Sequence, residues 1–203
     1  MSILKIFTFL FFFFMKFYFS FAQEKNIDTT ALPYLQKAEF NVFGVGIAYE
    51  LPFAKGFTLD SGMGFSSGAQ IINDKIKFQK SLFEPAFYLK SELKYYYNRY
   101  VRVAKKLPTR NGEGSYFAFQ NKFLTQRLFD SNNRLSNVLL YEIHWGIQRN
   151  VYNDFLFNFH IGLGRAHDFT TRGSTNYTSI GLKVSYLFAA KKITRSSFDK
   201  FKF

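Results

Sequence analysis

Large apolar residues recur at every second position through most of this chain, and no other feature limits its fold as strongly. In the segment Ile180–Phe188 every even-numbered residue is large and apolar, whereas the odd-numbered positions include Gly181, Lys183 and Ser185. Consecutive side chains of an extended strand point to opposite faces, so this spacing predicts a strand with one apolar face and one small or polar face. The same alternation predicts further strands over residues 43–51, 57–65, 83–97, 117–123, 139–147 and 155–163.

The volume of the apolar side chains decides which kind of barrel or sandwich these strands build. A soluble sandwich or barrel also alternates, but it turns its apolar face inward. Each strand offers about four or five bulky residues, and together they exceed what the interior of an eight-stranded barrel holds. The opposite face carries charges of both signs and small residues, among them Gly44, Gly46, Gly62, Gly162 and Gly164. Small and paired polar residues suit a crowded lumen, so we expect the apolar face to contact lipid.

Strand number follows from topology. Transmembrane barrels have an even number of strands, with short periplasmic turns and longer outer loops. The connection Asn150–Asp154 is short, whereas Gln70–Lys80, Gln126–Asn137 and Arg165–Thr175 are longer and polar. An eighth strand is therefore required before the seven visible ones, and we place it within Tyr34–Val42, where the alternation is poor. The predicted fold is all-β: a single transmembrane antiparallel up-and-down barrel, with a basic periplasmic connection for which a helix is one option.

The first 22 residues have the pattern of a secretory signal peptide. Lys5 precedes the apolar run Ile6–Met15, and Ser20 and Ala22 place small residues at the −3 and −1 positions of a cleavage site before Gln23. A retained membrane anchor is the alternative, although the run is short for a spanning helix. We divide the chain into a signal peptide (1–22), a short N-terminal segment (23–33), an outer-membrane barrel (34–188) and a basic C-terminal tail (189–203).

Net charge and cysteine content narrow the set of expected binding partners and sites. The formal net charge of +13 becomes +11 when Lys5 and Lys16 leave with the signal, and such an excess favours anionic neighbours. For an exported barrel these are outer-membrane lipid and lipopolysaccharide, and nucleic acid is not expected. The chain contains no cysteine, which excludes disulfides, thiolate metal sites and lipoprotein anchoring through an N-terminal cysteine.

Two segments carry a resemblance to known barrels. The strand that ends Tyr186-Leu187-Phe188 resembles the C-terminal insertion signal of small bacterial outer-membrane barrels, in which apolar residues alternate up to a terminal aromatic residue. The matching positions are Ile180, Leu182, Val184, Tyr186 and Phe188. The departure is the tail 189–203, since many barrels end at that aromatic residue. The resemblance implies location in the outer membrane of a Gram-negative bacterium and recognition by the barrel-insertion machinery.

The segment Tyr95–Lys106, followed by Asn111–Phe117, is similar to a linker in a group of bacterial barrels to which no chemistry is assigned. In that group an aromatic strand end leads into a basic connection and then into a new strand. The basic residues here are Arg99, Arg102, Lys105, Lys106 and Arg110. They could contact anionic headgroups or a partner, but a solvated loop with ordinary anchoring charges is the favoured interpretation.

The polar face of the strands predicts a set of lumen residues. A proton or ion path is one interpretation, and a salt-bridged plug that leaves no through-pore is the favoured one. The set consists of Glu84, Lys90, Glu92, Lys94, Glu142, His144, Gln148, Asn158, His160 and Lys183.

The three histidines invite a metal or hydrolase hypothesis. His144 and His160 face the lumen on adjacent predicted strands, but their spacing does not guarantee the third ligand that a metal site needs. His167 lies beside Asp168 and near Ser174, without the surroundings expected of a lipid deacylase. We therefore predict no catalytic, cofactor-binding or metal site.

The expected function is that of a non-catalytic outer-membrane barrel that supports the envelope or presents its loops to a protein partner. Two alternatives stay open. One is a lipid-modifying enzyme in the same membrane, and the other is a narrow pore or an accessory subunit of a secretion or uptake complex.

Overall fold

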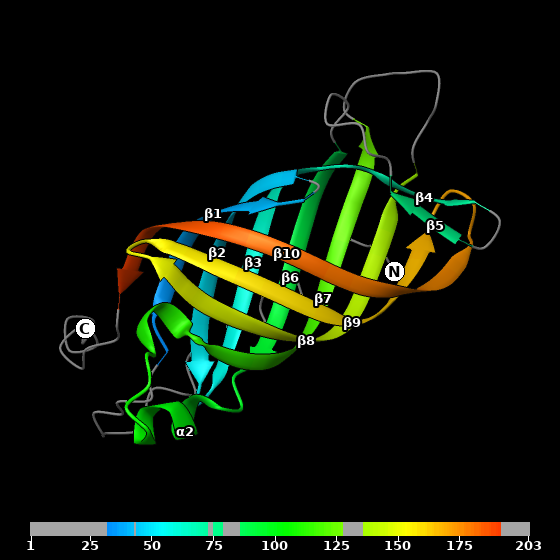
Figure 1. Cartoon of the computed structure of the whole chain (residues 1–203). Helices are drawn as coiled ribbons and strands as arrows, with labels where there is room; N and C mark the ends of the chain where they lie inside the picture. Colours follow the sequence, from blue (N-terminus) through cyan, green and yellow to red (C-terminus); the bar gives the residue numbers. More distant parts are fainter. Residues whose placement is uncertain (1–31, 43, 73–74, 79–85, 128–135, 192–203) are drawn as a thin grey trace, which may run out of the picture. The chain divides into compact units, whose positions relative to one another are not determined.

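The computed structural model describes residues 32–42, 44–72, 75–78, 86–127 and 136–191. Within them eight strands form a closed antiparallel barrel in the order β1-β10-β9-β8-β7-β6-β3-β2 (Figure 1). The barrel strands are β1 (Tyr34–Asn41), β2 (Gly44–Ala54), β3 (Phe57–Ser66), β6 (Ala86–Tyr95), β7 (Gly114–Arg127), β8 (Val138–Tyr152), β9 (Phe155–Asp168) and β10 (Ser174–Lys191). The predicted all-β barrel and its strand number are confirmed. In this part of the chain, no helix has the length and apolar character needed to cross a membrane.

The eighth strand, required by parity alone, is β1. It closes the barrel by pairing with β10 on one side and β2 on the other. Its alternation is hard to see in the sequence because Gln36 and Ala38 occupy the two outward positions between Tyr34 and Phe40. The regularity lies on the other face, where Lys37 and Glu39 are buried inside the barrel.

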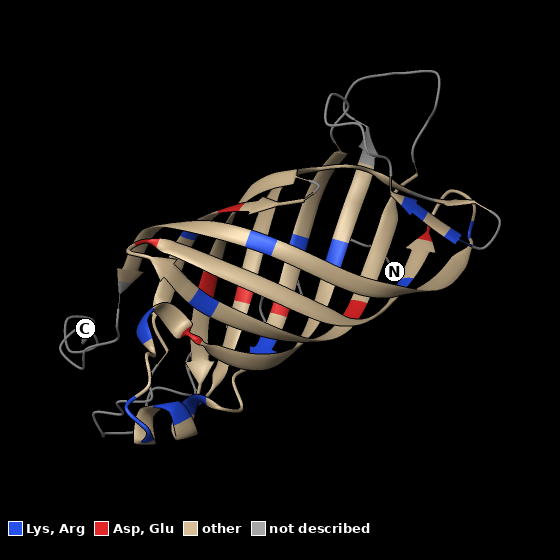
Figure 2. Ribbon diagram, in the orientation of Figure 1, with Lys and Arg blue, Asp and Glu red and all other residues tan. Residues whose placement is uncertain are grey.

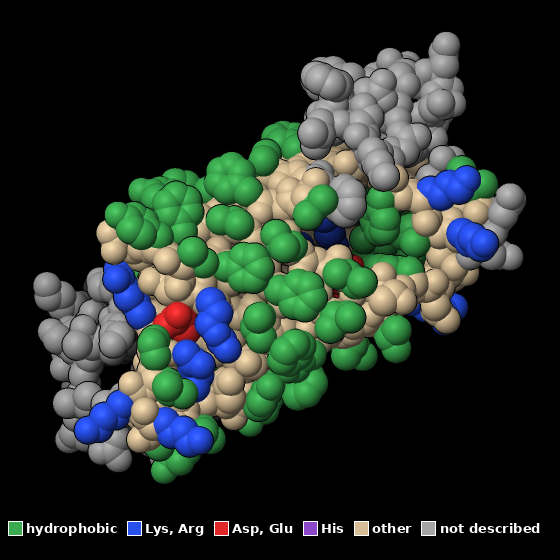
Figure 3. All heavy atoms as spheres, viewed as in Figure 1, with side chains coloured by type: hydrophobic (Ala, Val, Ile, Leu, Met, Phe, Trp, Pro, Cys, Tyr) green, Lys and Arg blue, Asp and Glu red, His purple; other side chains and the backbone are tan. Residues whose placement is uncertain are grey.

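The apolar face of the strands points outward. Ile143, Leu163, Ile180 and Phe188 retain 67%, 72%, 64% and 61% of their surface exposed. Hydrophobic side chains cover much of the barrel surface in Figure 3, while charged residues of the same strands are buried inside. This distribution is the reverse of a soluble barrel, which hides its apolar face.

Three predicted boundaries are wrong. β9 runs through Arg165 to Asp168 and β10 already begins at Ser174, which shortens the predicted loop 165–175. Within the predicted loop 70–80 lies a two-stranded sheet of β4 (Ala69–Ile72) and β5 (Lys75–Phe78). At its other end β10 continues past Phe188 to Lys191. Sequence alternation marks a strand only where one face is apolar, so it does not reveal the polar ends of β9 and β10 around Arg165–Asp168 and Ser174–Asn176.

The connection between β6 and β7 contains helix α2 (Arg99–Ala104) and a 3₁₀ turn, η1 (Arg110–Gly112). The helical option for this basic segment is therefore correct. The connection lies at the inner end, the end of the barrel at which β1 begins and β10 finishes (Figure 1). The opposite end, with β4 and β5, is called the outer end below.

On one side of the outer end the barrel wall is shorter, because β1 and β2 end before β10 does. β10 pairs with β1 over Lys183–Lys191. Beyond this ladder, the segment Asn176–Leu182 pairs with β9 and forms no ladder with another described strand, although Tyr177 packs against Phe78 of β5. β1 and β2 stop at the row of Asn41 and Gly44, which is paired with Lys183. Figure 1 shows β10 running past the end of β1, and the same region is hollowed in Figure 3.

Glycines on the inner face make room for large side chains of neighbouring strands. A Cβ added at Gly46 or Gly64 would collide with the phenol of Tyr88, and one at Gly164 would collide with the ring of Tyr177. Because protein interiors tolerate little overlap, these pairs fix both side chains in place. Three of the glycines that predict a crowded lumen thus allow tyrosine rings to enter it.

Candidate functional site: the charged lumen

Most residues of the predicted lumen set lie inside the barrel, and Figure 2 shows acidic and basic positions near one another on neighbouring strands. His160 is partly buried, and Glu84 lies outside the described residues. The buried members are Lys90, Glu92, Lys94, Glu142, His144, Gln148, Asn158 and Lys183.

The inner half of the lumen holds a network of two lysines and two carboxylates. Lys37 Nζ lies 2.8 Å from Glu50 Oε2 and 2.6 Å from Asp60 Oδ2. Lys94 Nζ lies 3.2 Å and 2.9 Å from the same two oxygens. Tyr96 donates its hydroxyl to Glu50 Oε1 over 2.9 Å. Each carboxylate thus contacts both lysines, which offsets the cost of burying these charges.

A second set of ion pairs lies next to the first. Lys90 contacts Glu39, and Lys183 Nζ lies 3.0 Å from the other oxygen of Glu39. Lys183 also lies 3.9 Å from Glu92, and Lys90 lies 3.5 Å from Asp60, which joins the two sets. The combined network, the lysine–carboxylate network below, contains four lysines and four carboxylates: Lys37, Lys90, Lys94, Lys183, Glu39, Glu50, Asp60 and Glu92.

Sequence reasoning missed half of this network. Glu50 shares its phase with Gly44 and Gly46, and Asp60 shares its phase with Gly62. The alternation along these strands therefore predicts that both carboxylates face inward, as the glycines do. Lys37 and Glu39 were missed for another reason, because the apolar pattern of their strand is poor.

Glu142 stands apart from the lysine–carboxylate network. Its Oε1 accepts a hydrogen bond from the hydroxyl of Tyr177 over 2.7 Å. Its Oε2 accepts from Ser179 Oγ over 2.8 Å and from Gln120 Nε2 over 3.2 Å. Among the described residues no lysine or arginine lies within ion-pair distance of Glu142. The groups that surround its carboxylate are two hydroxyls, an amide and two histidines.

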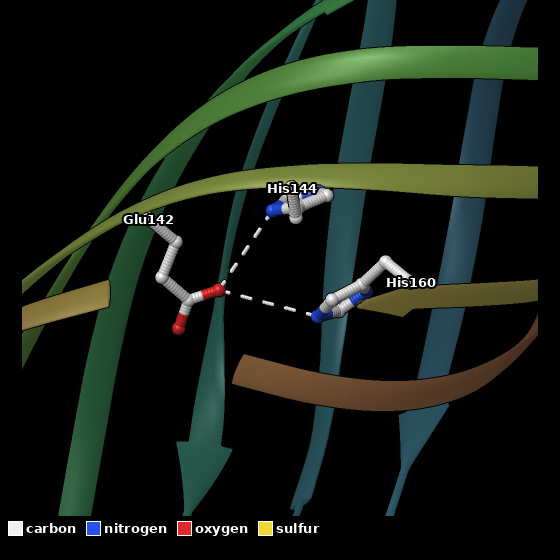
Figure 4. Close-up of side chains that lie close together, drawn as sticks. All are labelled: Glu142, His144 and His160. Atoms are coloured by element: carbon white, nitrogen blue, oxygen red, sulfur yellow. Dashed lines mark ion pairs between the residues drawn. The ribbon is translucent and has the colours of Figure 1, made fainter. Parts of the chain in front are cut away.

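His144 and His160 lie beside this carboxylate and point toward it (Figure 4). His144 Nδ1 is 3.9 Å and His160 Nε2 is 4.0 Å from Glu142 Oε2. The two imidazole rings stack with their centroids 4.3 Å apart. On its other side His144 Nε2 lies 3.2 Å from Glu92 Oε1. The structure therefore supplies the third side chain that the spacing of the histidines left open.

Lys122 is the lysine of the lumen that lies outside the lysine–carboxylate network. Its Nζ lies 4.4 Å from the centroid of the Tyr88 ring. In the described part of the chain no carboxylate comes within ion-pair distance of it. A cation over an aromatic face is stabilised by the ring quadrupole, which partly replaces an ion pair.

The basic connection is more ordered than a solvated loop. Arg99 is buried and donates to the carbonyl of Thr109 over 3.0 Å. Arg102 donates to the carbonyl of Pro108, and Arg110 lies 3.9 Å from Asp154. Lys105 and Lys106 are exposed. Two of the five basic side chains thus hold the backbone of the connection, and the exposed lysines remain available to an anionic surface.

His167 lies at the outer end, where its Nδ1 is 2.9 Å from Ser174 Oγ. The carboxylate of Asp168 is directed elsewhere: its Oδ1 accepts the backbone N–H groups of Thr170 and Thr171 over 2.8 Å and 3.1 Å. A hydrolytic triad needs a third group that orients the histidine. Asp168 instead holds the turn between β9 and β10.

The remaining predicted sites fall on strands or outside the described residues. Ala22 and Gln23 of the expected cleavage site lie outside them, as does the tail beyond Lys191. Ile180, Leu182, Tyr186 and Phe188 of the expected insertion strand are exposed on the outer face of β10, and Val184 is partly buried there.

Comparison of the chain with protein-family models, with curated proteins and with solved structures finds no match. Fold and lumen together define the class of molecule: a closed eight-stranded antiparallel barrel with an apolar outside and an ion-paired inside.

Proposed function

We propose that this chain is an outer-membrane barrel of a Gram-negative bacterium, without catalytic activity, that supports the envelope or presents its outer end to a partner. The observation that carries the proposal is its inverted polarity. Large apolar side chains of all eight strands face outward, while the lysine–carboxylate network is buried inside. In water this exposed apolar surface would cost roughly 25 cal/mol per Å², whereas lipid solvates it at no such cost.

Strand length agrees with a membrane span. A tilted strand crosses the hydrocarbon core with about 9–11 residues. β2, β3 and β6 contain 11, 10 and 10 residues. β8 and β10 contain 15 and 18, so these strands would project beyond the membrane and raise the turns at the outer end above the lipid.

The filled lumen favours a structural role over a conducting one. Lys37, Lys94 and Asp60 have side-chain exposures of 1%, 0% and 0%, so they leave little room for water between them. A narrow pore would need mobile or solvated charges along its axis. Paired, buried charges support a closed barrel instead.

The outer end supplies the surface for a partner. Ala69 and Ile71 of the β4–β5 hairpin pack against Tyr88, Leu124 and Leu140 at the top of the lumen. The hairpin is thereby anchored to the barrel and presents its exposed residues on a fixed support. At the inner end, Lys105 and Lys106 suit contact with anionic headgroups. Lipopolysaccharide and the barrel-insertion machinery are the further partners that this location implies.

Fractionation of cells that express the full chain tests the proposal. We expect the protein in the outer-membrane fraction, with a mobility on gels that changes after boiling, as folded barrels show. Recovery from the soluble periplasm without detergent would refute it. Planar-bilayer recordings of the purified barrel should show no steady conductance, and a stable open channel would overturn the structural role while leaving the membrane location intact.

A further inference from the structure

We infer that Glu142, His144 and His160 form a binding site for a divalent first-row transition-metal ion, with Zn²⁺ as the reference ion. The three side chains come from adjacent strands β8 and β9, and one potential ligand atom from each lies within 4.8 Å of the other two. They surround a common point in Figure 4.

The distances suit an ion after a small contraction. With metal–ligand bonds of about 2.1 Å, the ligand atoms of a tetrahedral site lie roughly 3.4 Å apart. Here His144 Nδ1 and His160 Nε2 are 3.9 Å and 4.0 Å from Glu142 Oε2. A shift of a few tenths of an ångström in each side chain closes that difference, and rotation of the stacked rings, whose planes lie 28° apart, is needed to direct both lone pairs at one ion.

The environment of His144 directs one nitrogen toward this point. Its Nε2 lies 3.2 Å from Glu92 Oε1, and because a carboxylate oxygen accepts, the tautomer that makes this hydrogen bond carries its proton on Nε2. In the neutral ring the lone pair then resides on Nδ1, which is buried and has no hydrogen-bond partner among the described residues. A lone pair that faces the carboxylate oxygen of Glu142 is repulsive unless a cation lies between them. A carboxylate behind a ligand histidine is the usual outer shell of zinc sites.

The carboxylate of Glu142 is likewise held in position to bind an ion. Tyr177, Ser179 and Gln120 all donate to it, which fixes the orientation of the carboxylate. The lysine–carboxylate network is balanced without it, since four lysines there face four carboxylates. Glu142 and Lys122 are the lumen charges that lie outside this network, and of the two Glu142 is the one that faces both histidines.

The fold makes the space that His160 occupies. His160 is paired with Gly146 on β8 and with Gly181 on β10. A Cβ at Gly181 would collide with the imidazole ring of His160. Two nitrogen ligands and one oxygen ligand favour a transition ion over Ca²⁺ or Mg²⁺, which prefer oxygen. Three protein ligands also leave a fourth position open, and His160, with 18% of its side chain exposed, is the most accessible of the three.

Metal uptake by the folded full-length barrel, purified in detergent and stripped with a chelator, tests the inference. We expect about one equivalent of Zn²⁺ by equilibrium dialysis with elemental analysis, unaffected by excess Ca²⁺ or Mg²⁺. His160→Ala and Glu142→Gln should abolish this uptake. Glu92→Gln should weaken it by roughly ten- to a hundredfold, because it removes the carboxylate behind His144.

His167→Ala is the matched control, since it removes the remaining histidine of the chain, outside the cluster, and should bind Zn²⁺ like the unmodified protein. Heat-dependent gel mobility verifies that each variant is folded. If a variant does not fold, titration of the unmodified barrel with Co²⁺ still decides the question: a visible spectrum of four-coordinate Co²⁺ with nitrogen ligands supports the site. Absence of uptake, or uptake that His167→Ala removes and His160→Ala keeps, overturns it. The first of these results is expected if His144 is doubly protonated and bridges Glu92 and Glu142 itself.

Discussion

The inner and outer halves of the barrel are held together by different means. At the inner half every strand is paired on both sides, and the lumen is filled by the lysine–carboxylate network. At the outer half the β10 segment Asn176–Leu182 lies beyond the end of β1, and the lumen is filled by an apolar cluster that includes the β4–β5 hairpin. A continuous ladder with buried charge pairs resists opening, because any displacement exposes unpaired charges. The outer half has weaker constraints and is the part suited to exchange and recognition.

Loss of one charge in the inner network should have the largest effect. Asp60 contacts Lys37, Lys90 and Lys94, so Asp60→Asn leaves three buried lysines with too little negative charge. We expect the free energy of unfolding to fall by about 3–5 kcal/mol. Urea titration of the refolded barrel in lipid vesicles measures it. Lys105→Met on the exposed connection is the control and should change it by less than about 0.5 kcal/mol. Equal effects of the two variants would mean that the network does not hold the inner half together.

A lysine introduced on the outward face of a strand tests whether that face contacts lipid. Ile161 is on the outer surface of β9 near its middle, and Ile161→Lys should cost roughly 2–4 kcal/mol in vesicles. Asn176→Lys, near the outer end of β10, should cost no more than about 1 kcal/mol because it reaches the interface. If Ile161→Lys is neutral or stabilising, the apolar surface does not face lipid and the membrane proposal fails.

The β4–β5 hairpin should open without unfolding the barrel. Ile71 is buried against the apolar cluster at the outer end, so Ile71→Ser weakens the anchor of the hairpin. We expect cleavage by added protease within residues 69–78 to accelerate several-fold, while global stability falls by no more than about 1 kcal/mol. Val138→Ser, in the wall of the same cluster, is the comparison and should lower global stability more. A loss of global stability as large as that of Val138→Ser would show that the hairpin is part of the cooperative unit.

The smallest expected difference lies in the amide exchange rates along β10 of the unmodified protein. In the part of the chain that the structure describes, backbone amides of Asn176–Leu182 that point away from β9 form no ladder with a second strand, whereas those of Lys183–Leu187 are held between two strands. Amide hydrogen exchange followed by NMR should therefore be at least tenfold faster at alternate residues of the first segment. Uniform protection along β10 would mean that another part of the chain closes this side of the wall.

Sequence reasoning was strongest where one face of a strand is apolar and the other is not. Phe155–Leu163 and Ile180–Phe188 were assigned with the correct faces, and β1 was found from parity although its residues hardly show it. The extensions of β9 and β10 were missed because polar residues occupy both faces there. Glu142 was placed in the lumen, yet its position as a third side chain beside His144 and His160 did not follow from spacing.

The sequence by itself determined the seven barrel strands that have one apolar face and which of their side chains face inward, because these depend on a period of two that one chain segment carries alone. Only the tertiary structure decided which charges meet, since partners such as Lys37 and Asp60 lie on strands that are not neighbours in the barrel. It also decided that Glu142, His144 and His160 lie close together, and that the ladder between β1 and β10 ends at Lys183, short of the outer end of β10. Those outcomes depend on the stagger between strands, and stagger is fixed by closure of the whole barrel rather than by any local pattern.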